Sequence, residues 1–302
     1  PIFNVKDKVI EFETGNVLIG SVSRLYMSNK CLLIADHKSV DKQIHIFNKN
    51  DFSYLTSIGN FGEGPEEITV MGCLAIDEAH HQLYVSDHAK QKIFSYDMDS
   101  VMVDSLYKPQ VKTAMNETLF PSEYQYINDT LSIAVLIKPT STSTFNQFLG
   151  RWNMNTGEMI PMKYTHPDIQ KKRITFAASE KAGIYVECYT RHDLMTICSL
   201  DGELLYNIYG PDWDGGNGNK LQSFGTVMIG NDKIFVSYCG EDYARDSFPT
   251  KILVFDLEGN YLKTLETGYK ISDCCYDSFN NRIILSLNDV VQFAYLDIDG
   301  II

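Results

Sequence analysis

The side chains that could do chemistry in this chain lie far apart in its sequence. Glu123 and Asp273 each stand near the start of an apolar, strand-like segment, and Arg24 occupies a similar place. Carboxylate oxygens are the ligands that Ca²⁺ prefers, whereas a guanidinium beside a carboxylate forms an ion pair instead. The three residues therefore favour a structural ion pair or a water-filled channel, with a calcium site at Glu123 and Asp273 as the alternative.

A second group of side chains suits the binding of a partner. The loop Cys239–Thr250 carries Tyr243, Arg245 and Phe248, and the Gly-rich segment 209–220 carries Trp213. Tyr, Trp and Arg are enriched where protein interfaces bind most strongly, so we expect these two segments to form one ligand-facing lip. The alternative is that Phe248 and Trp213 only pack against the rim of their own blades. With the polar residues of other loops, the candidate binding residues are Arg24, Glu67, Glu123, Arg191, His192, Trp213, Tyr243, Arg245, Phe248 and Asp273.

Several other reactions lack their motifs. The Gly-rich run around Gly62 contains Pro65, which has no N–H to donate, and Glu63, Glu66 and Glu67, which would repel a phosphate. The sequence has no G-x-S-x-G motif, and its seven cysteines lack the C-x-x-C spacing of zinc sites. No residue is therefore assigned a catalytic role, and no cofactor is predicted apart from the alternative Ca²⁺.

The elements that must position these residues form a repeat. Apolar strand-like segments ending in Asn-, Asp- or Gly-rich turns recur six times, at spacings of roughly 40 to 60 residues. The turns are centred on Asn50, Asp99, Asn155, Asp201, Glu258 and Asp299. Four short strands fit into each unit, which is the organisation of a β-propeller. The sequence thus predicts an all-β fold: a six-bladed β-propeller of four-stranded antiparallel blades in a single domain, residues 1–302.

The last unit is one strand short. It offers strands at 271–276, 282–287 and 290–297 before the chain reaches Ile302. An unpaired strand edge invites aggregation, and closed β architectures remove it. The one unassigned segment with alternating apolar and acidic residues is Lys8–Glu13, near the N-terminus. We expect this segment to complete the sixth blade.

Two motifs carry a family resemblance. Residues 59–67 form a G-x-x-G-x-G-P-x-E pattern, and residues 83–93 combine an apolar strand, Asp87, a polar loop and a Lys-Ile strand start. The chain resembles the TolB-like six-bladed propeller proteins, a bacterial group related to the NHL-repeat propellers. The motifs are sharp only within residues 32–97, so the resemblance bears on the fold more than on an activity. It implies an exported, periplasmic or cell-surface protein without an assigned reaction.

The same resemblance bears on individual residues. In NHL-like repeats an Asp at the positions of Asp36 and Asp87 hydrogen-bonds the loop that follows it. Gluconolactonase-like and paraoxonase-like propellers hold calcium with Glu, Asn and Asp on their inner strands. Here the comparable positions offer Glu123 and Asp273, and the remainder of that ligand set is missing.

Composition narrows the range of partners. The 39 acidic and 26 basic residues give a formal net charge of −13, which opposes binding to nucleic acid and to anionic membranes. No apolar run approaches the ~20 residues that span a bilayer, so no transmembrane segment is predicted. Because the chain begins at Pro1, we expect a trimmed form that has lost any export signal or lipid-attachment Cys.

These observations lead to a functional hypothesis, although a propeller scaffold hosts many unrelated functions. The sequence favours a non-catalytic binding or scaffold protein of the cell envelope. It would recognise a protein, peptide or glycan on one face of the propeller. The alternative is a metal-dependent lactonase-like hydrolase or lyase with its site in the central channel.

Overall fold

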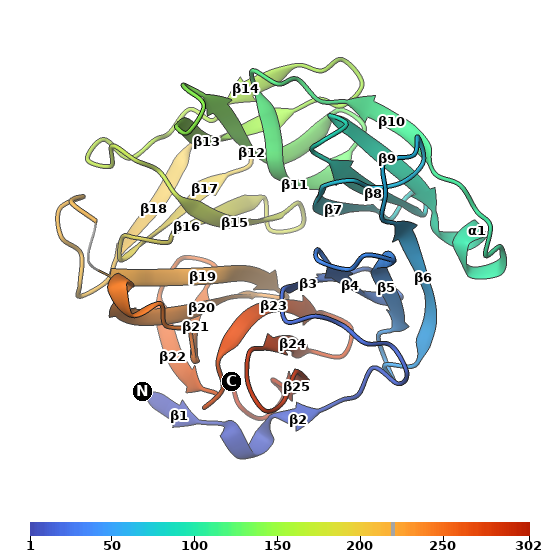
Figure 1. Cartoon of the computed structure of the whole chain (residues 1–302). Helices are drawn as coiled ribbons and strands as arrows, with labels where there is room; N and C mark the ends of the chain where they lie inside the picture. The colour runs from blue at the N-terminus through green and yellow to red at the C-terminus, as the bar shows by residue number, and fades with distance from the viewer. Residues whose placement is uncertain (219–220) are drawn as a thin grey trace. The chain divides into compact units, whose positions relative to one another are not determined.

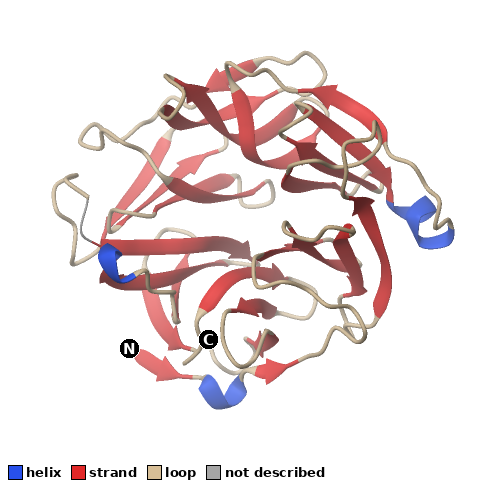
Figure 2. Cartoon of the chain, viewed as in Figure 1, coloured by secondary structure: helices blue, strands red, loops and turns tan. Residues whose placement is uncertain are grey.

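Nearly all of the regular structure is β-strand (Figure 2). The computed structural model describes residues 1–218 and 221–302. Within them the helical pieces are short: α1 (Met98–Val103) and the 3-10 turns η1 (Lys6–Lys8) and η2 (Tyr243–Arg245). The described residues divide into two compact units, Thr14–Met162 and Pro1–Glu13 with Lys163–Ile302, and each unit is taken in turn.

The unit Thr14–Met162 contains three four-stranded antiparallel sheets, here called blades one to three. In chain order the strands of blade one are β3 (Ser23–Met27), β4 (Cys31–Asp36), β5 (Lys42–Asn48) and β6 (Tyr54–Asn60). Those of blade two are β7 (Met71–Asp77), β8 (Gln82–Asp87), β9 (Lys92–Asp97) and β10 (Gln110–Ala114). Blade three has β11 (Phe120–Asn128), β12 (Leu131–Pro139), β13 (Phe145–Trp152) and β14 (Met159–Pro161).

The second unit contains blades four to six. Blade four has β15 (Ile174–Ser179), β16 (Ile184–Tyr189), β17 (Leu194–Ser199) and β18 (Leu204–Tyr209). Blade five has β19 (Leu221–Gly230), β20 (Lys233–Asp242), β21 (Lys251–Asp256) and β22 (Tyr261–Glu266). Blade six takes β23 (Ile271–Asp277), β24 (Arg282–Leu287) and β25 (Phe293–Asp297) from the end of the chain.

The N-terminus supplies the missing strand of blade six. Strand β2 (Ile10–Glu11) pairs antiparallel with β25, with Ile10 opposite Tyr295, so the predicted completion of this blade is confirmed. The sequence did not predict β1 (Ile2–Asn4), which pairs parallel with β22 and gives blade five a fifth strand. In Figure 1 the two blue N-terminal strands lie beside the orange and red strands of these blades.

The core lies between neighbouring sheets of a unit. Between blades one and two, Leu33 and Ile46 of one sheet pack with Leu83 and Phe94 of the other, and each is at most 1% exposed. A strand covered on both faces loses the alternation of apolar and polar residues, and all six residues of β4 are buried. Each buried Leu or Phe is worth about 1.5 to 3 kcal/mol. The second and third strands of a blade therefore hold the unit together.

In blades two and six, the turn between the first two strands is fixed by a buried aspartate. Asp277 accepts hydrogen bonds from the backbone N–H groups of Phe279 and Asn280, both at 3.2 Å. Asp77 holds the matching turn of blade two, where it accepts from the His80 backbone at 3.2 Å. Short polar side chains that bind the following backbone are typical of such turns.

Deleting residues 1–14 should lower the melting temperature sharply. The deletion removes β2 and two apolar anchors, because Val5 is 2% exposed and Val9 packs against the same core cluster. Loss of the two valines costs about 3 kcal/mol. For a domain of this size that corresponds to a fall of about 6 to 12 °C, which circular dichroism can follow.

A matched control deletes residues 1–3 alone. This change removes most of β1 but keeps Val5, Val9 and the pairing of β2 with β25. It should lower the melting temperature far less than the longer deletion. Equal effects of the two deletions would contradict a closing role for β2.

Candidate functional site

A cation–π contact between Arg191 and Tyr243 connects the loops of blades four and five. The guanidinium carbon of Arg191, which follows β16, lies 3.5 Å from the centroid of the Tyr243 ring in the loop after β20. Tyr238 of β20 also hydrogen-bonds the Asp193 carboxylate, so a second contact links the same two blades. We call the surface formed by residues 189–193, 209–218 and 241–248 the lip. The predicted segment 209–220 extends to residues 219–220, which lie outside the described residues.

The loop of blade five presents its apolar side chains to solvent. Tyr243 is 45% exposed and Phe248 is 37% exposed, although both are large and apolar. The Asp242 carboxylate accepts a hydrogen bond from the Ala244 N–H at 2.9 Å and so caps the short turn η2. Arg245 lies 3.5 Å from Glu241, and both side chains are more than half exposed. An exposed ion pair of this kind contributes little to stability, which leaves Arg245 available to a partner.

Trp213 packs onto blade four and is only partly exposed. Its ring centroid lies 5.0 Å from Tyr209, 5.4 Å from His166 and 6.0 Å from His192. The Tyr209 hydroxyl and His166 Nε2 are 2.9 Å apart, which fixes the outer part of this cluster. Contacts at these distances are typical of stabilising aromatic pairs. The cluster therefore supports the segment 209–218 as a rigid surface on blade four.

His192 lies beneath that segment and is 6% exposed. A Cβ on Gly218 would come within 2.0 Å of the His192 ring, so only glycine fits there. Nδ1 of His192 has no hydrogen-bond partner among the described residues and lies 3.9 Å from Asp214. Burial lowers the pKa of His192, with His166 acting in the same direction and Asp214 against it. His192 is thus held as a neutral ring that packs against Trp213.

Asp193 ties the link between blades to the sheet. Its carboxylate accepts the Asp212 N–H at 2.9 Å, and a Cβ on Gly210 would lie 2.1 Å from it. Burial raises the pKa of Asp193, and the hydrogen bonds from Asp212 and Tyr238 only partly offset this rise. The run 191–193 thus consists of a stacked arginine, a packed histidine and a loop-fixing carboxylate.

The remaining predicted site residues have structural partners. Arg24 and Glu123 form an ion pair, with side chains 38% and 36% exposed. Asp273 is buried and accepts a hydrogen bond from the Thr226 hydroxyl at 2.9 Å. Glu67 accepts the Gly64 N–H at 3.1 Å and fills the space beside Gly62, where a Cβ would lie 1.6 Å from its carboxylate.

These partners bear on the calcium hypothesis. Glu123 and Asp273 belong to different units, and each has a partner within its own unit. A cation at Glu123 would have to compete with the Arg24 guanidinium for the same carboxylate. The calcium site at these two residues stays a prediction, and the ion pair works against it.

Among the described residues, three side chains of metal-binding types lie close together, and the sequence did not predict this group. Single ligand atoms of Asp77, His80 and Asp129 all lie within 4.8 Å of one another. The Asp77 carboxylate is already bound to His80 at 2.7 Å and to the Tyr84 hydroxyl at 2.8 Å. The Lys112 ammonium lies 3.8 Å from Asp129 and supplies a positive charge there. The three side chains therefore already have hydrogen-bond or ionic partners within the protein. The group was not predicted because Asp129 is far from Asp77 and His80 in the sequence.

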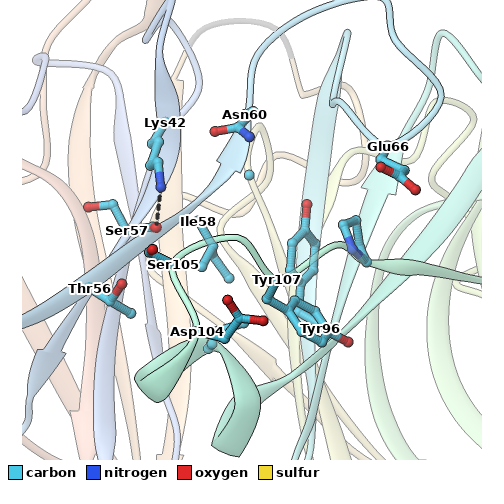
Figure 3. A pocket seen from close by; sticks show the side chains of 13 residues that line it. Lys42, Thr56, Ser57, Ile58, Asn60, Glu66, Tyr96, Asp104, Ser105 and Tyr107 are labelled. Atoms are coloured by element: carbon cyan, nitrogen blue, oxygen red, sulfur yellow. Dashed lines mark hydrogen bonds between the residues drawn. The ribbon is translucent and has the colours of Figure 1, made fainter.

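Among the pockets formed by the described residues, two lie between blades one and two. The smaller, of about 40 Å³, has room for water but not for a ligand. Figure 3 shows Asp104, Ser105 and Tyr107 lining it with Lys42, Thr56 and Ser57 of blade one. The Tyr96 hydroxyl at its wall has no hydrogen-bond partner within the described part of the chain, so a water here would satisfy it. The larger pocket, of about 490 Å³, is considered below.

Comparisons with known proteins bear on the fold. Residues 2–148, just under half of the chain, match a family described as a 6-bladed beta-propeller (DUF5128). Solved structures match over nearly the whole length. The fold is a six-bladed β-propeller. This confirms the predicted fold class, while the finer TolB-like and NHL resemblance stays a prediction.

Three of these structures illustrate the match. A Bacteroides fragilis protein named as predicted to be exported is 14% identical with a TM-score of 0.59, covering 94% of this chain and 85% of its own. A DUF4221 family member from Bacteroides vulgatus is 10% identical with a TM-score of 0.59, covering 95% and 94%. The Cps50 (Swd1) propeller domain of Myceliophteria thermophila is 10% identical with a TM-score of 0.58, covering 95% and 98%. At such identities the likeness concerns the fold alone.

Two searches gave negative results. A comparison with curated protein sequences found no match. Among the described residues, no helix is long and apolar enough to cross a membrane.

Stability should fall on mild acidification. Burial lowers the pKa of His45, His88 and His192 below the unfolded value of about 6.5. The folded state therefore binds fewer protons, so the stability from these rings is complete above pH 6.5 and is lost as the pH falls. We expect the melting temperature to drop between about pH 7 and pH 5, in a scanning fluorimetry series. The aspartates with lowered pKa, such as Asp87, lose their contribution only at lower pH.

Substitution of His192 tests its share of this dependence. His192→Gln should reduce the pH slope, because the variant has no titrating ring at that buried position. The control is Phe279→Ala, at an exposed turn residue that carries no titrating group. It should keep the wild-type slope. Identical slopes for the wild type and His192→Gln would show that His192 does not contribute.

Proposed function

We propose that this protein is a non-catalytic binding protein that recognises a protein or peptide through the lip. The observation that carries the proposal is the stacking of Arg191 on Tyr243, which joins the loops of two blades into one surface. Tyr243 and Phe248 remain largely exposed on that surface, and Arg245 is free of strong pairing. Large aromatic and Arg side chains of this kind dominate the energetics of protein interfaces.

The ionisable groups at the lip support binding more than catalysis. A general base needs a pKa near the working pH and an accessible atom. His192 is buried with a lowered pKa, and the Asp193 and Asp214 carboxylates accept hydrogen bonds from backbone N–H groups of the segment 209–218. Their hydrogen bonds shape the surface, and His192 is too buried to act as a base on a bound molecule.

A protein or peptide fits the lip better than a glycan does. Sugar rings stack on broad, open aromatic faces, whereas the Trp213 ring packs among Tyr209, His166 and His192. The exposed groups are the ends of long side chains on a short, capped turn. A glycan remains the alternative ligand, and the experiment below separates the two.

We also propose that the protein acts in the cell envelope and that residues 1–302 form a single propeller domain. The TolB-like resemblance and the similarity to a Bacteroides fragilis protein named as predicted to be exported both support export. The similarity to these solved structures extends over 94% or more of this chain, which supports a single domain.

The proposal predicts peptide ligands that depend on the lip. Purified protein would be screened against a displayed random-peptide library and, in parallel, a glycan array. Selected peptides should lose affinity roughly 30-fold with Tyr243→Ala, as expected for a hot-spot side chain worth about 2 kcal/mol. Fluorescence anisotropy of labelled peptides measures the effect.

The matched control is Phe279→Ala. Phe279 is another exposed aromatic of the same unit, 77% exposed, in the turn between β23 and β24. Its substitution should leave peptide affinity unchanged. Peptides that bind Tyr243→Ala as tightly as the wild type, or glycans as the sole ligands, would overturn the proposal.

A further inference from the structure

A cleft of about 490 Å³ opens between blades one and two, outside the lip. One wall comes from the turn after β3 and the start of β6, and the other from the turn after β7 and from α1. All of these elements belong to the unit Thr14–Met162. The volume lies within the range of sites that hold small organic ligands, unlike the neighbouring pocket of about 40 Å³.

The apolar part of the cleft is lined by side chains that can adapt to a ligand. Leu55 is 43% exposed and Met102 is 36% exposed, and Ile76 and Met98 line the cleft with them. Unbranched methionine side chains adapt to irregular ligand shapes, which suits a site for an apolar body of variable outline. Both methionines come from α1, an insertion between the third and fourth strands of blade two.

The polar part of the cleft is acidic and is fixed in place. Glu78 accepts the Asn29 N–H at 2.7 Å, and Asp99 lies 2.9 Å from Nδ1 of His81. Asp77 also lines the cleft, with both of its oxygens hydrogen-bonded, one to the His80 backbone and the other to the His80 ring and the Tyr84 hydroxyl. Of the positive side chains, Lys30 and, when protonated, His81 line the same space. Three carboxylates therefore outnumber the cations at the cleft.

We propose that this cleft binds a small amphipathic cation: an organic amine whose apolar body lies against Leu55, Met98 and Met102. Its ammonium would lie near Glu78 and Asp99. The excess of carboxylates favours a positive ligand, and charge-assisted hydrogen bonds to carboxylates are stronger than neutral ones. The inference is independent of the lip, because it rests on residues of the other unit.

The test uses a matched pair of fluorescent probes. Dansylcadaverine carries an apolar dansyl group and a primary ammonium, and N-pentyl dansylamide has the same body without the charge. Dansylcadaverine should bind saturably with a rise in dansyl emission, and at least tenfold more tightly than the neutral probe. Raising the salt concentration should weaken binding of the charged probe alone.

Substitutions locate the binding. The double variant Glu78→Gln, Asp99→Asn should weaken dansylcadaverine roughly tenfold and leave the neutral probe unchanged. Met102→Ser should weaken both probes, because it removes apolar wall. Glu158→Gln, at an exposed turn of blade three in the same unit, and Tyr243→Ala, at the lip, should have no effect. Equal affinity for both probes, or charged-probe binding unaffected by the double variant, would overturn the proposal, as would the absence of saturable binding.

Discussion

The outer edge of a four-stranded sheet is the constraint on which much of this structure depends. Its unpaired N–H and C=O groups attract other strands unless something pairs with them or shields them. The chain solves the problem differently from blade to blade. Blade six receives β2 as its fourth strand, and blade five receives β1 beyond its own fourth strand. In blade two the insertion α1 contacts β6, the outer strand of blade one. The larger cleft is bounded by that same insertion.

Buried carboxylates do the second structural task, which is to fix the links between blades. Asp87 and Asp193 both lie at most 5% exposed, yet their pKa values move in opposite directions. Asp87 accepts N–H groups of Thr69, Val70, Ala89 and Lys90, and the Lys90 ammonium lies 3.4 Å away. Asp193 has fewer donors, so burial dominates and raises its pKa. The donors around a buried carboxylate and the charges beside it, Lys90 near Asp87 and Asp212 near Asp193, together decide the sign of the pKa shift.

The sequence predicted the parts of the fold that depend on local patterns. Turn residues and the spacing of strands gave the six four-stranded units, and the alternation in Lys8–Glu13 gave the strand that completes blade six. The short strand β1 was not predicted, because three residues are too few to show an alternation of apolar and polar side chains. The interpretation of Asp87 as a residue that holds a loop agrees with its hydrogen bonds, because the chemistry of Asp beside backbone N–H groups is local.

The candidate sites were less accessible to sequence reasoning. Residue type identified Tyr243, Phe248 and Arg191 as candidates, but the stacking of Arg191 on Tyr243 depends on how two blades pack. Glu67 stays a candidate, and the structure shows that its carboxylate also shapes its own Gly-rich loop. No sequence pattern distinguishes a carboxylate that binds a ligand from one that binds its own backbone. The residues that line the acidic cleft are spread between positions 28 and 102, and they meet only because two sheets pack together. No sequence motif marks this cleft.

The two proposed surfaces follow from a common physical feature. In a sheet covered on both faces, the middle strands are committed to packing, so substitutions there cost stability. Variation is tolerated where the chain leaves the sheet, because longer loops add little closure entropy. The blade-five loop and the α1 insertion are both departures of this kind, and both expose large apolar side chains next to charges that are held in place. Exposed apolar side chains that gather beside such charges mark candidate binding surfaces, which is why these two places, and not the packed strands, are where binding is expected.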